Sequence, residues 1–567
     1  MNDTKNPKML NEMGDRYFEG RNTEQNIELA YTYYKQAADT GNPVGLYNVG
    51  RYFLAKEQYK NAIDYLTKAL SSGYAQAYLL LAEMAMSGKG MRKNKKKAFK
   101  YTQEGAKFGD TDAYNQLARY YLEGIGCSKD ERKAWEYYQK SADLDNVVGM
   151  YQLARLHLSS QPGRKSAQNA LHWLDKAIEM KYVPAIHLAI ELYQTPHPEF
   201  KKRSQTFREE MIFYYLEKLA QSGDVPALEK VALDYYEGSS VTKMNHEKAR
   251  AYFQILSDKN QTIGLYGLGS SFLYGHGGVK DHKKAKVLLE QAAERGFEKA
   301  MAKLGEIYRL GFGVTADPEQ AMKWYYDAAK KDHPEALLNL GLLHYRNEIP
   351  HASGELAFKY VENAKKKGSI QADYWLGIFY EKGVGVPVSA TLSEKHLLQA
   401  IQNNVVAAHY KYAMLQYDQA QMVKGKKKQK RMFEAFEHFR AYLKSPSGAK
   451  SNQSMAAYQI ALMFHQGFVR DPNLRTARYW YEYASELGHP KAMIEVYRML
   501  KKNEPVHALK YLNHAMELND PEAWYELGVY FLEGSSIQSA DPARAKEYFL
   551  HAARLKFKPA VDRLAML

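Results

Sequence analysis

The chain has 567 residues, 45% hydrophobic content, one cysteine, Cys127, and a formal net charge of +15. One cysteine excludes intrachain disulfides and the zinc sites that need two or four cysteines, and the lack of any run of eighteen apolar residues excludes a membrane-spanning helix. The first fifteen residues lack the apolar segment of a signal peptide. We therefore expect a cytoplasmic protein.

A small residue returns along nearly the whole chain, and eight of the fifteen intervals are 36 residues long. Such a period is typical of stacked copies of one supersecondary unit, without a single compact core. The small residues are Gly14, Gly50, Ala82, Ala118, Ala154, Ala189, Ala232, Gly269, Gly305, Gly341, Gly377, Ala413, Ala461, Gly528 and Ala565, and Tyr497 takes the same position once.

Each unit is predicted to form two amphipathic helices. The first follows A-x-x-x-L-G-x-x-Y, as in residues 300–308, and the second follows A-x-x-W/Y-Y/L-x-x-A-A-x-x-G, as in residues 321–329. These spacings place the apolar residues on one stripe of a helix. The small residue marks a close helix crossing, and Gly or Asn at the end of the second helix predicts a left-handed C′ residue. The C′ candidates are Gly41, Gly73, Gly109, Gly223, Gly296, Gly368, Gly488, Asn260, Asn404 and Asn519.

The loop between the two helices is also patterned, as in Gly311-Phe-Gly-Val-Thr-Ala-Asp317, where the Asp is placed to cap the second helix. Together with the A-x-x-W-Y-x-x-A-A segment, this unit resembles the Sel1-like repeat, a relative of the tetratricopeptide repeat. The resemblance implies an all-α, right-handed α/α solenoid of about fifteen helix-turn-helix repeats. It also implies a non-catalytic scaffold whose first helices line a concave groove.

In chain order, we expect a short polar lead over residues 1–7 and repeats one to six over 8–195. Repeats six to twelve follow over 196–417, with an irregular loop near 196–206. Repeats twelve to fifteen cover 418–557, with a long basic loop over 418–431. A closing helix over 558–567 would cover the last exposed face.

The sequence contains no catalytic motif of the metalloprotease, hydrolase or P-loop type. The histidines follow the repeat and show no ligand spacing. We therefore expect no enzyme activity, no cofactor and no metal site.

Candidate binding residues follow from the resemblance, which implies that two positions per unit face the groove: the residue after the small one and the residue three before it. Arginine at the first position suits carboxylates, and tyrosine at the second gives rigid contact area. For the tyrosines, packing against the next repeat is the main alternative. The candidates are Arg51, Arg119, Arg155, Arg498, Tyr47, Asn115, Tyr151, Tyr266, Tyr374 and Tyr410.

Two functions remain open at this point. The first is a scaffold or adaptor that binds an extended peptide or a partner domain, with a bias towards acidic partners. The alternative is a basic solenoid that binds nucleic acid or another polyanion, through lysine-rich runs over residues 92–97 and 424–431. Solvated loops without a partner would explain these runs as well.

Overall fold

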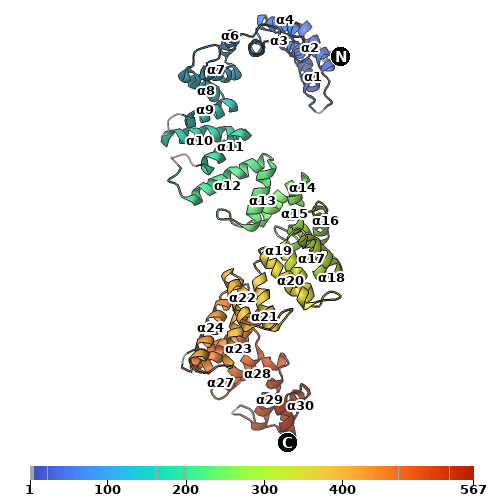
Figure 1. The fold of residues 1–567 in the computed structure, drawn as a ribbon, viewed down its shortest axis with the longest axis vertical. Helices are drawn as coiled ribbons and strands as arrows, with labels where there is room; N and C mark the ends of the chain where they lie inside the picture. The colour runs from blue at the N-terminus through green and yellow to red at the C-terminus, as the bar shows by residue number, and fades with distance from the viewer. Residues whose placement is uncertain are drawn as a thin grey trace. The chain divides into compact units, whose positions relative to one another are not determined.

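The computed structural model describes residues 6–21, 23–159, 164–195, 200–469, 471–535 and 537–566. The chain divides into two units, Met1–Lys280 and Asp281–Leu567. In the described residues, the regular secondary structure consists of 31 α-helices (Figure 1). The repeat period therefore predicted the fold class correctly.

The first unit contains fifteen of these helices. They are α1 (Pro7–Glu19), α2 (Ile27–Asp39), α3 (Pro43–Ala55), α4 (Tyr59–Ser71), α5 (Ala77–Ser87), α6 (Lys95–Ala106), α7 (Thr111–Glu123), α8 (Glu131–Asp143), α9 (Val147–Ser159), α10 (Arg164–Glu179), α11 (Val183–Gln194), α12 (Gln205–Gln221), α13 (Val225–Glu237), α14 (His246–Asp258) and α15 (Thr262–Tyr274).

The second unit contains the remaining helices in its described residues. They are α16 (His282–Glu294), α17 (Glu298–Leu310), α18 (Pro318–Ala329), α19 (Pro334–Tyr345), α20 (Gly354–Lys366), α21 (Ala372–Lys382), α22 (Ala390–Gln402), α23 (Val406–Gln421), α24 (Gly425–Leu443), α25 (Lys450–His465), α26 (Leu474–Glu486), α27 (Pro490–Leu500), α28 (Pro505–Glu517), α29 (Pro521–Glu533), α30 (Pro542–Arg554) and α31 (Lys558–Leu564).

Odd-numbered helices are the first helices of the repeats and even-numbered helices are the second. Within each unit, a helix contacts chiefly its neighbours in the sequence, as expected for stacked repeats. The described residues contain two helices for each of the fifteen predicted repeats, and α31 lies where the closing helix was predicted. Its Ala560 is fully buried, and Leu564 packs against the C-terminal core.

The recurring small residue lies where the two helices of a repeat cross. A Cβ atom on Gly305 would lie 2.5 Å from the ring of Tyr325, and one on Gly377 would lie 2.7 Å from the side chain of Leu397. Both distances are shorter than carbon atoms tolerate. The predicted close helix crossing is therefore confirmed.

Helix ends follow the predicted chemistry. Asp130 and Asp317 accept hydrogen bonds from the backbone N–H groups of Lys133 and Gln320, which caps α8 and α18. All ten predicted C′ residues, Asn404 among them, have positive φ angles, which glycine and asparagine adopt most readily. At these helices the sequence thus marks the end of the helix as well as its buried face.

One part of the expected organisation is wrong. The predicted basic loop over 418–431 is helical except at residues 422–424, because α23 extends to Gln421 and α24 begins at Gly425. Lysine and glutamine favour helix, and the buried residues Met432 and Ala435 continue the stripe that anchors α24. The other basic run, residues 92–97, was also predicted as a loop, and its last three lysines form the start of α6, which begins at Lys95.

The predicted domain boundaries at 195, 417 and 557 stay predictions, and the division into two units falls at Lys280. Within the predicted irregular loop near 196–206, residues 196–199, which include Pro196 and Pro198, lie outside the described residues. From Gln205 the chain is helical again, as α12.

Candidate functional site

The four predicted arginines occupy one repeat position but have different surroundings. Arg51 on α3 reaches back to α1, where its Nη1 lies 3.3 Å from Asp15 Oδ1 and its Nη2 lies 4.0 Å from Glu19 Oε1. Its guanidinium carbon lies 4.9 Å from the centre of the Phe18 ring. The charge of Arg51 is therefore largely satisfied within the protein.

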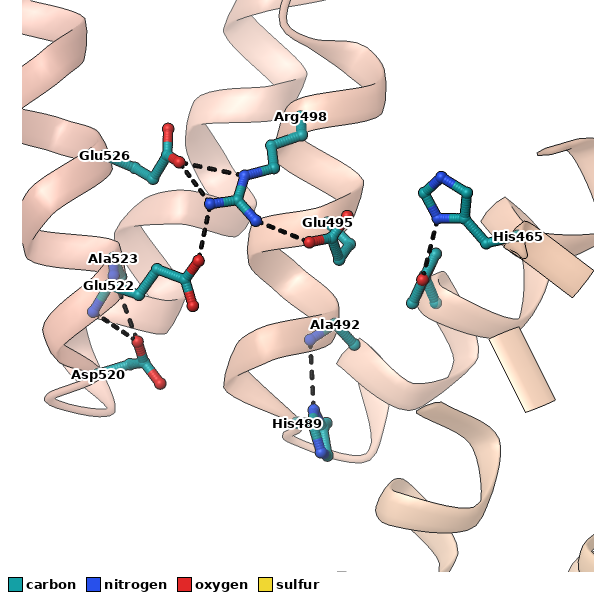
Figure 2. Close-up of polar contacts among 10 residues, drawn as sticks. His465, His489, Ala492, Glu495, Arg498, Asp520, Glu522, Ala523 and Glu526 are labelled. Atoms are coloured by element: carbon teal, nitrogen blue, oxygen red, sulfur yellow. Dashed lines mark hydrogen bonds and ion pairs between the residues drawn. The ribbon is translucent and has the colours of Figure 1, made fainter. Parts of the chain in front are cut away.

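Arg498 on α27 is bound more completely (Figure 2). Its guanidinium contacts Glu495 at 2.7 Å, Glu522 at 2.7 Å and Glu526 at 2.6 Å. Burial lowers the pKa of Arg498, but the hydrogen bonds with Glu526 and Glu522 outweigh it and raise the pKa overall. Arg498 therefore joins α27 to α29.

Arg119 on α7 and Arg155 on α9 are exposed, and neither forms an ion pair with a described residue. Each guanidinium lies near a tyrosine of its own helix: Arg119 is 5.8 Å from the Tyr120 ring centre, and Arg155 is 5.9 Å from that of Tyr151. Among the predicted arginines, these two keep a charge that is open to a ligand.

Both arginines line surface hollows between successive first helices. The hollow between α7 and α9 has a volume of about 280 Å³, with Asn115 and Arg119 on one wall, Gln152 on the other and Tyr138 of α8 between them. Asp112 also lines it. Sequence reasoning missed Tyr138 and Gln152, because neither occupies one of the two repeat positions assigned to the groove.

The hollow between α9 and α11 has a volume of about 310 Å³. Arg155 stands at its side, and Leu158, Leu188 and Leu192 supply an aliphatic lining, with Glu191 also present. Because α9 contributes to both hollows, the first-helix face of α7, α9 and α11 offers two adjoining recesses.

Asn115 links two repeats at the first hollow. Its Nδ2 donates to Asn146 Oδ1 at 2.9 Å, and the same Asn146 oxygen accepts from the backbone N–H groups of Val148 and Gly149 to cap α9. Since that oxygen is an acceptor, the orientation of the Asn115 amide is fixed. Asn115 Oδ1 is then buried without a partner among the described residues.

Two of the predicted tyrosines, Tyr47 and Tyr151, lie against the following repeat. The rings of Tyr47 and Tyr74 are 4.9 Å apart, and those of Tyr151 and Tyr182 are 5.7 Å apart. Each second partner lies at or near the start of the next first helix, so these contacts join repeats. Binding of a partner by these rings stays a prediction.

The remaining predicted tyrosines, Tyr266, Tyr374 and Tyr410, are half-buried. Tyr374 packs against the cluster that contains Val405, and burial raises its pKa to about 12. Tyr410 lies 5.4 Å from Tyr442, ring centre to ring centre. Tyr266 is half-buried on α15.

The described residues contain no group of three or more His, Cys, Asp or Glu side chains arranged to hold a metal ion. In the same part of the chain, no helix combines the length and apolar character needed to cross a membrane. Cys127 lies in the loop before α8, and burial raises the pKa of its thiol.

Comparison with known proteins gives a limited sequence match and broad structural matches. A sel1-like repeat-containing protein, L21, of Acanthamoeba polyphaga mimivirus is 37% identical over 73 residues, which is 13% of this chain and 14% of that protein. The chain therefore spans well under two thirds of that relative.

Two crystal structures match most of the chain. The protective antigen c5321 of uropathogenic Escherichia coli, which displays an SLR fold, is 22% identical, with a TM-score of 0.40 over 88% of this chain and 95% of that one. A Sel1 repeat protein from Oxalobacter formigenes is 17% identical, with a TM-score of 0.27 over 72% and 93%.

Twelve segments, which together make up more than half of the chain, match the Sel1 repeat family. The matched residues are 7–42, 43–74, 75–110, 111–146, 147–182, 225–260, 262–297, 298–333, 334–369, 370–405, 454–489 and 521–557. The three helix pairs without a match are those of the sixth, twelfth and fourteenth repeats, where the sequence departs most from the pattern. The chain belongs to the Sel1 repeat family.

Proposed function

We propose that this protein is a non-catalytic adaptor that binds an extended, acidic peptide segment of a protein partner on the first-helix face of α7, α9 and α11. Sel1 repeats generally build scaffolds for protein interactions. The observation that carries the proposal is that Arg119 and Arg155 are exposed, form no ion pair with a described residue and border two adjoining hollows.

The chemistry of the two hollows defines the ligand. A guanidinium binds a carboxylate through two parallel hydrogen bonds, so Arg119 and Arg155 favour Asp or Glu side chains. The aliphatic hollow beside Arg155, lined by Leu188 and Leu192, favours an apolar side chain. A segment that alternates acidic and apolar residues would satisfy both recesses.

The other predicted arginines have a different role in this proposal. Arg51 and Arg498 already bind carboxylates of the protein itself, so they stabilise the stack of repeats. The proposal places the protein in the cytoplasm, in line with its single cysteine.

The test is a crosslinked capture of partners by the full chain, with nuclease present, followed by binding of the captured acidic peptide. The variant is Arg119→Glu/Arg155→Glu. The matched control, Lys426→Glu/Lys427→Glu, makes the same charge change at two exposed residues of α24.

We expect the arginine variant to lose at least tenfold in peptide affinity and the control to stay within threefold of the wild type. Arg119→Lys/Arg155→Lys should recover only part of the affinity, because lysine cannot bind a carboxylate in the same bidentate way. Equal affinity of the wild type and the Arg119→Glu/Arg155→Glu variant would show that this face is not the binding site.

A further inference from the structure

A second surface of the first unit carries a high positive charge. It consists of residues 56–60, 88–97 and 124–133, which form the loops before α4, α6 and α8 and the first turns of those helices; we name it the basic edge. These segments contain two, six and three lysine or arginine residues, all exposed. The only carboxylates in them are Glu57, Asp130 and Glu131.

The three segments adjoin one another. A Cβ on Gly90 would lie 2.6 Å from the Cβ of Tyr59, so the loop before α6 rests on the start of α4. A Cβ on Gly126 would lie 2.9 Å from the Cβ of Phe99 and would also meet the backbone of Lys95, so the loop before α8 rests on the start of α6. The basic edge is therefore continuous across three repeats.

Most of this charge lacks an internal counter-ion. Lys56 pairs with Glu28 at 2.6 Å, and Lys133 approaches Asp130 at 3.8 Å. Within the described chain, no ion pair is formed by the six central cations, which are Lys89, Arg92, Lys93, Lys95, Lys96 and Lys97. An anionic ligand would meet charges that the protein itself leaves unneutralised.

The start of α6 shows that this charge has a local cost. The helix begins with Lys95-Lys96-Lys97 and has no acidic residue in its first turn. Each cation there opposes the helix dipole by about 0.3–1 kcal/mol, and the cap from Asn94 offsets part of this. Local choices that oppose the fold are typical of functional sites.

The composition of the edge selects among anionic partners. None of its large apolar side chains is exposed, whereas protein interfaces have an apolar centre and amphipathic lipid-binding surfaces carry apolar side chains that insert. Tyr59 and Phe99 are half-buried, so no aromatic platform is open to the bases of a single strand. Flexible, unpaired lysines suit the phosphates of a duplex.

We propose that the basic edge binds the phosphate backbone of double-helical nucleic acid, independently of sequence. This proposal does not rest on the peptide site, because the two surfaces use different residues. DNA and RNA duplexes share the phosphate chemistry, and both serve as probes.

The experiment measures fluorescence anisotropy of labelled 30-base-pair DNA and RNA duplexes with the full chain between about 50 and 200 mM salt. The variant is Lys93→Glu/Lys95→Glu/Lys96→Glu. The matched control, Lys501→Glu/Lys502→Glu/Lys510→Glu at the end of α27 and on α28, makes the same change in net charge at exposed residues outside both lysine-rich runs. Circular dichroism checks that both variants keep their helices.

We expect the edge variant to bind duplex at least tenfold more weakly than the wild type, and the control to stay within threefold. For DNA, the slope of log K against log salt should become less negative by up to about 2.7, since each lost phosphate contact changes it by about 0.9. The Arg119→Glu/Arg155→Glu variant should keep its duplex affinity.

Three results would overturn the proposal. The first is an equal loss in the edge variant and the Lys501→Glu/Lys502→Glu/Lys510→Glu control, which would reflect net charge alone. The second is tighter binding of single-stranded RNA than of duplex. The third is binding of phosphatidylserine vesicles or polyglutamate in place of duplex. None of them bears on the peptide site, whose test includes nuclease.

Discussion

Replacing Arg498 by alanine should destabilise the C-terminal repeats selectively. The change removes every contact of the guanidinium with Glu495, Glu522 and Glu526 and leaves three carboxylates close together. The Glu526 side chain is only 11% exposed, so water cannot replace the lost partner fully. The same change at Arg119, which has no ion pair within the described chain, is the matched control.

The size of the effect follows from these contacts. Breaking a fully buried ion pair costs about 3–5 kcal/mol. The Arg498 side chain is 36% exposed, which reduces the expected loss to about 2–3 kcal/mol because water screens the charges. Arg119→Ala should change stability by less than about 0.5 kcal/mol.

Hydrogen exchange of the full chain, followed by mass spectrometry, measures the loss of stability in each helix. A loss of about 2–3 kcal/mol lowers protection in α27 and α29 by about 30- to 150-fold, while α1 to α14 should keep wild-type exchange. Adding Glu522→Gln/Glu526→Gln to Arg498→Ala should restore part of the protection. Unchanged exchange in α27 and α29 would refute the role given to Arg498.

Three further predictions concern the repeats. Gly305→Leu should lower the free energy of unfolding by about 1–3 kcal/mol, because the new side chain would overpack against Tyr325. The loss should appear as faster hydrogen exchange in α17 and α18, and wild-type exchange there would contradict the close crossing. His489 caps α27, and burial lowers its pKa to about 4. Its neutral form therefore stabilises the fold above pH 6.5, and the free energy of unfolding falls by about 2 kcal/mol as the pH falls to 5. His489→Asn keeps the cap and should flatten that pH dependence in thermal melts of the two proteins. Deleting residues 558–567 should loosen α27 to α30 and leave the first ten repeats folded, so uniform loss of protection would argue against a solenoid.

The sequence was sufficient to predict the repeat, because its two strongest constraints are local. A small residue is required where Tyr325 crosses Gly305, and a residue that tolerates positive φ is required where each second helix ends, as at Asn404. The basic segment before Met432 was misassigned as a loop, since its lysines supply charge without any apolar period. The segment is nevertheless helical, because its residues favour helix and the buried stripe that begins at Met432 anchors α24.

The candidate site was less predictable, because Arg51 and Arg498 find counter-ions in neighbouring repeats. Arg498 pairs with residues 24 and 28 positions later, and Arg51 pairs with a residue 36 positions earlier. A search at one repeat position finds the arginines but not their counter-ions. Tyr138 and Gln152 were missed for the same reason, since they meet Arg119 only when helices are stacked.

The charges at equivalent positions of successive repeats separate the structural arginines from the candidate binding residues. Asp15 and Arg51 occupy the same position in consecutive repeats, and they attract each other. Arg119 and Arg155 stand in the same relation but carry like charges, so neither can be the counter-ion of the other. Glu83 precedes Arg119 by one repeat, yet no ion pair joins the two in the described structure. An acidic ligand on α7 and α9 would therefore supply the carboxylates that Asp15 and Glu19 supply to Arg51, and its affinity should fall with salt, as expected for exposed charges.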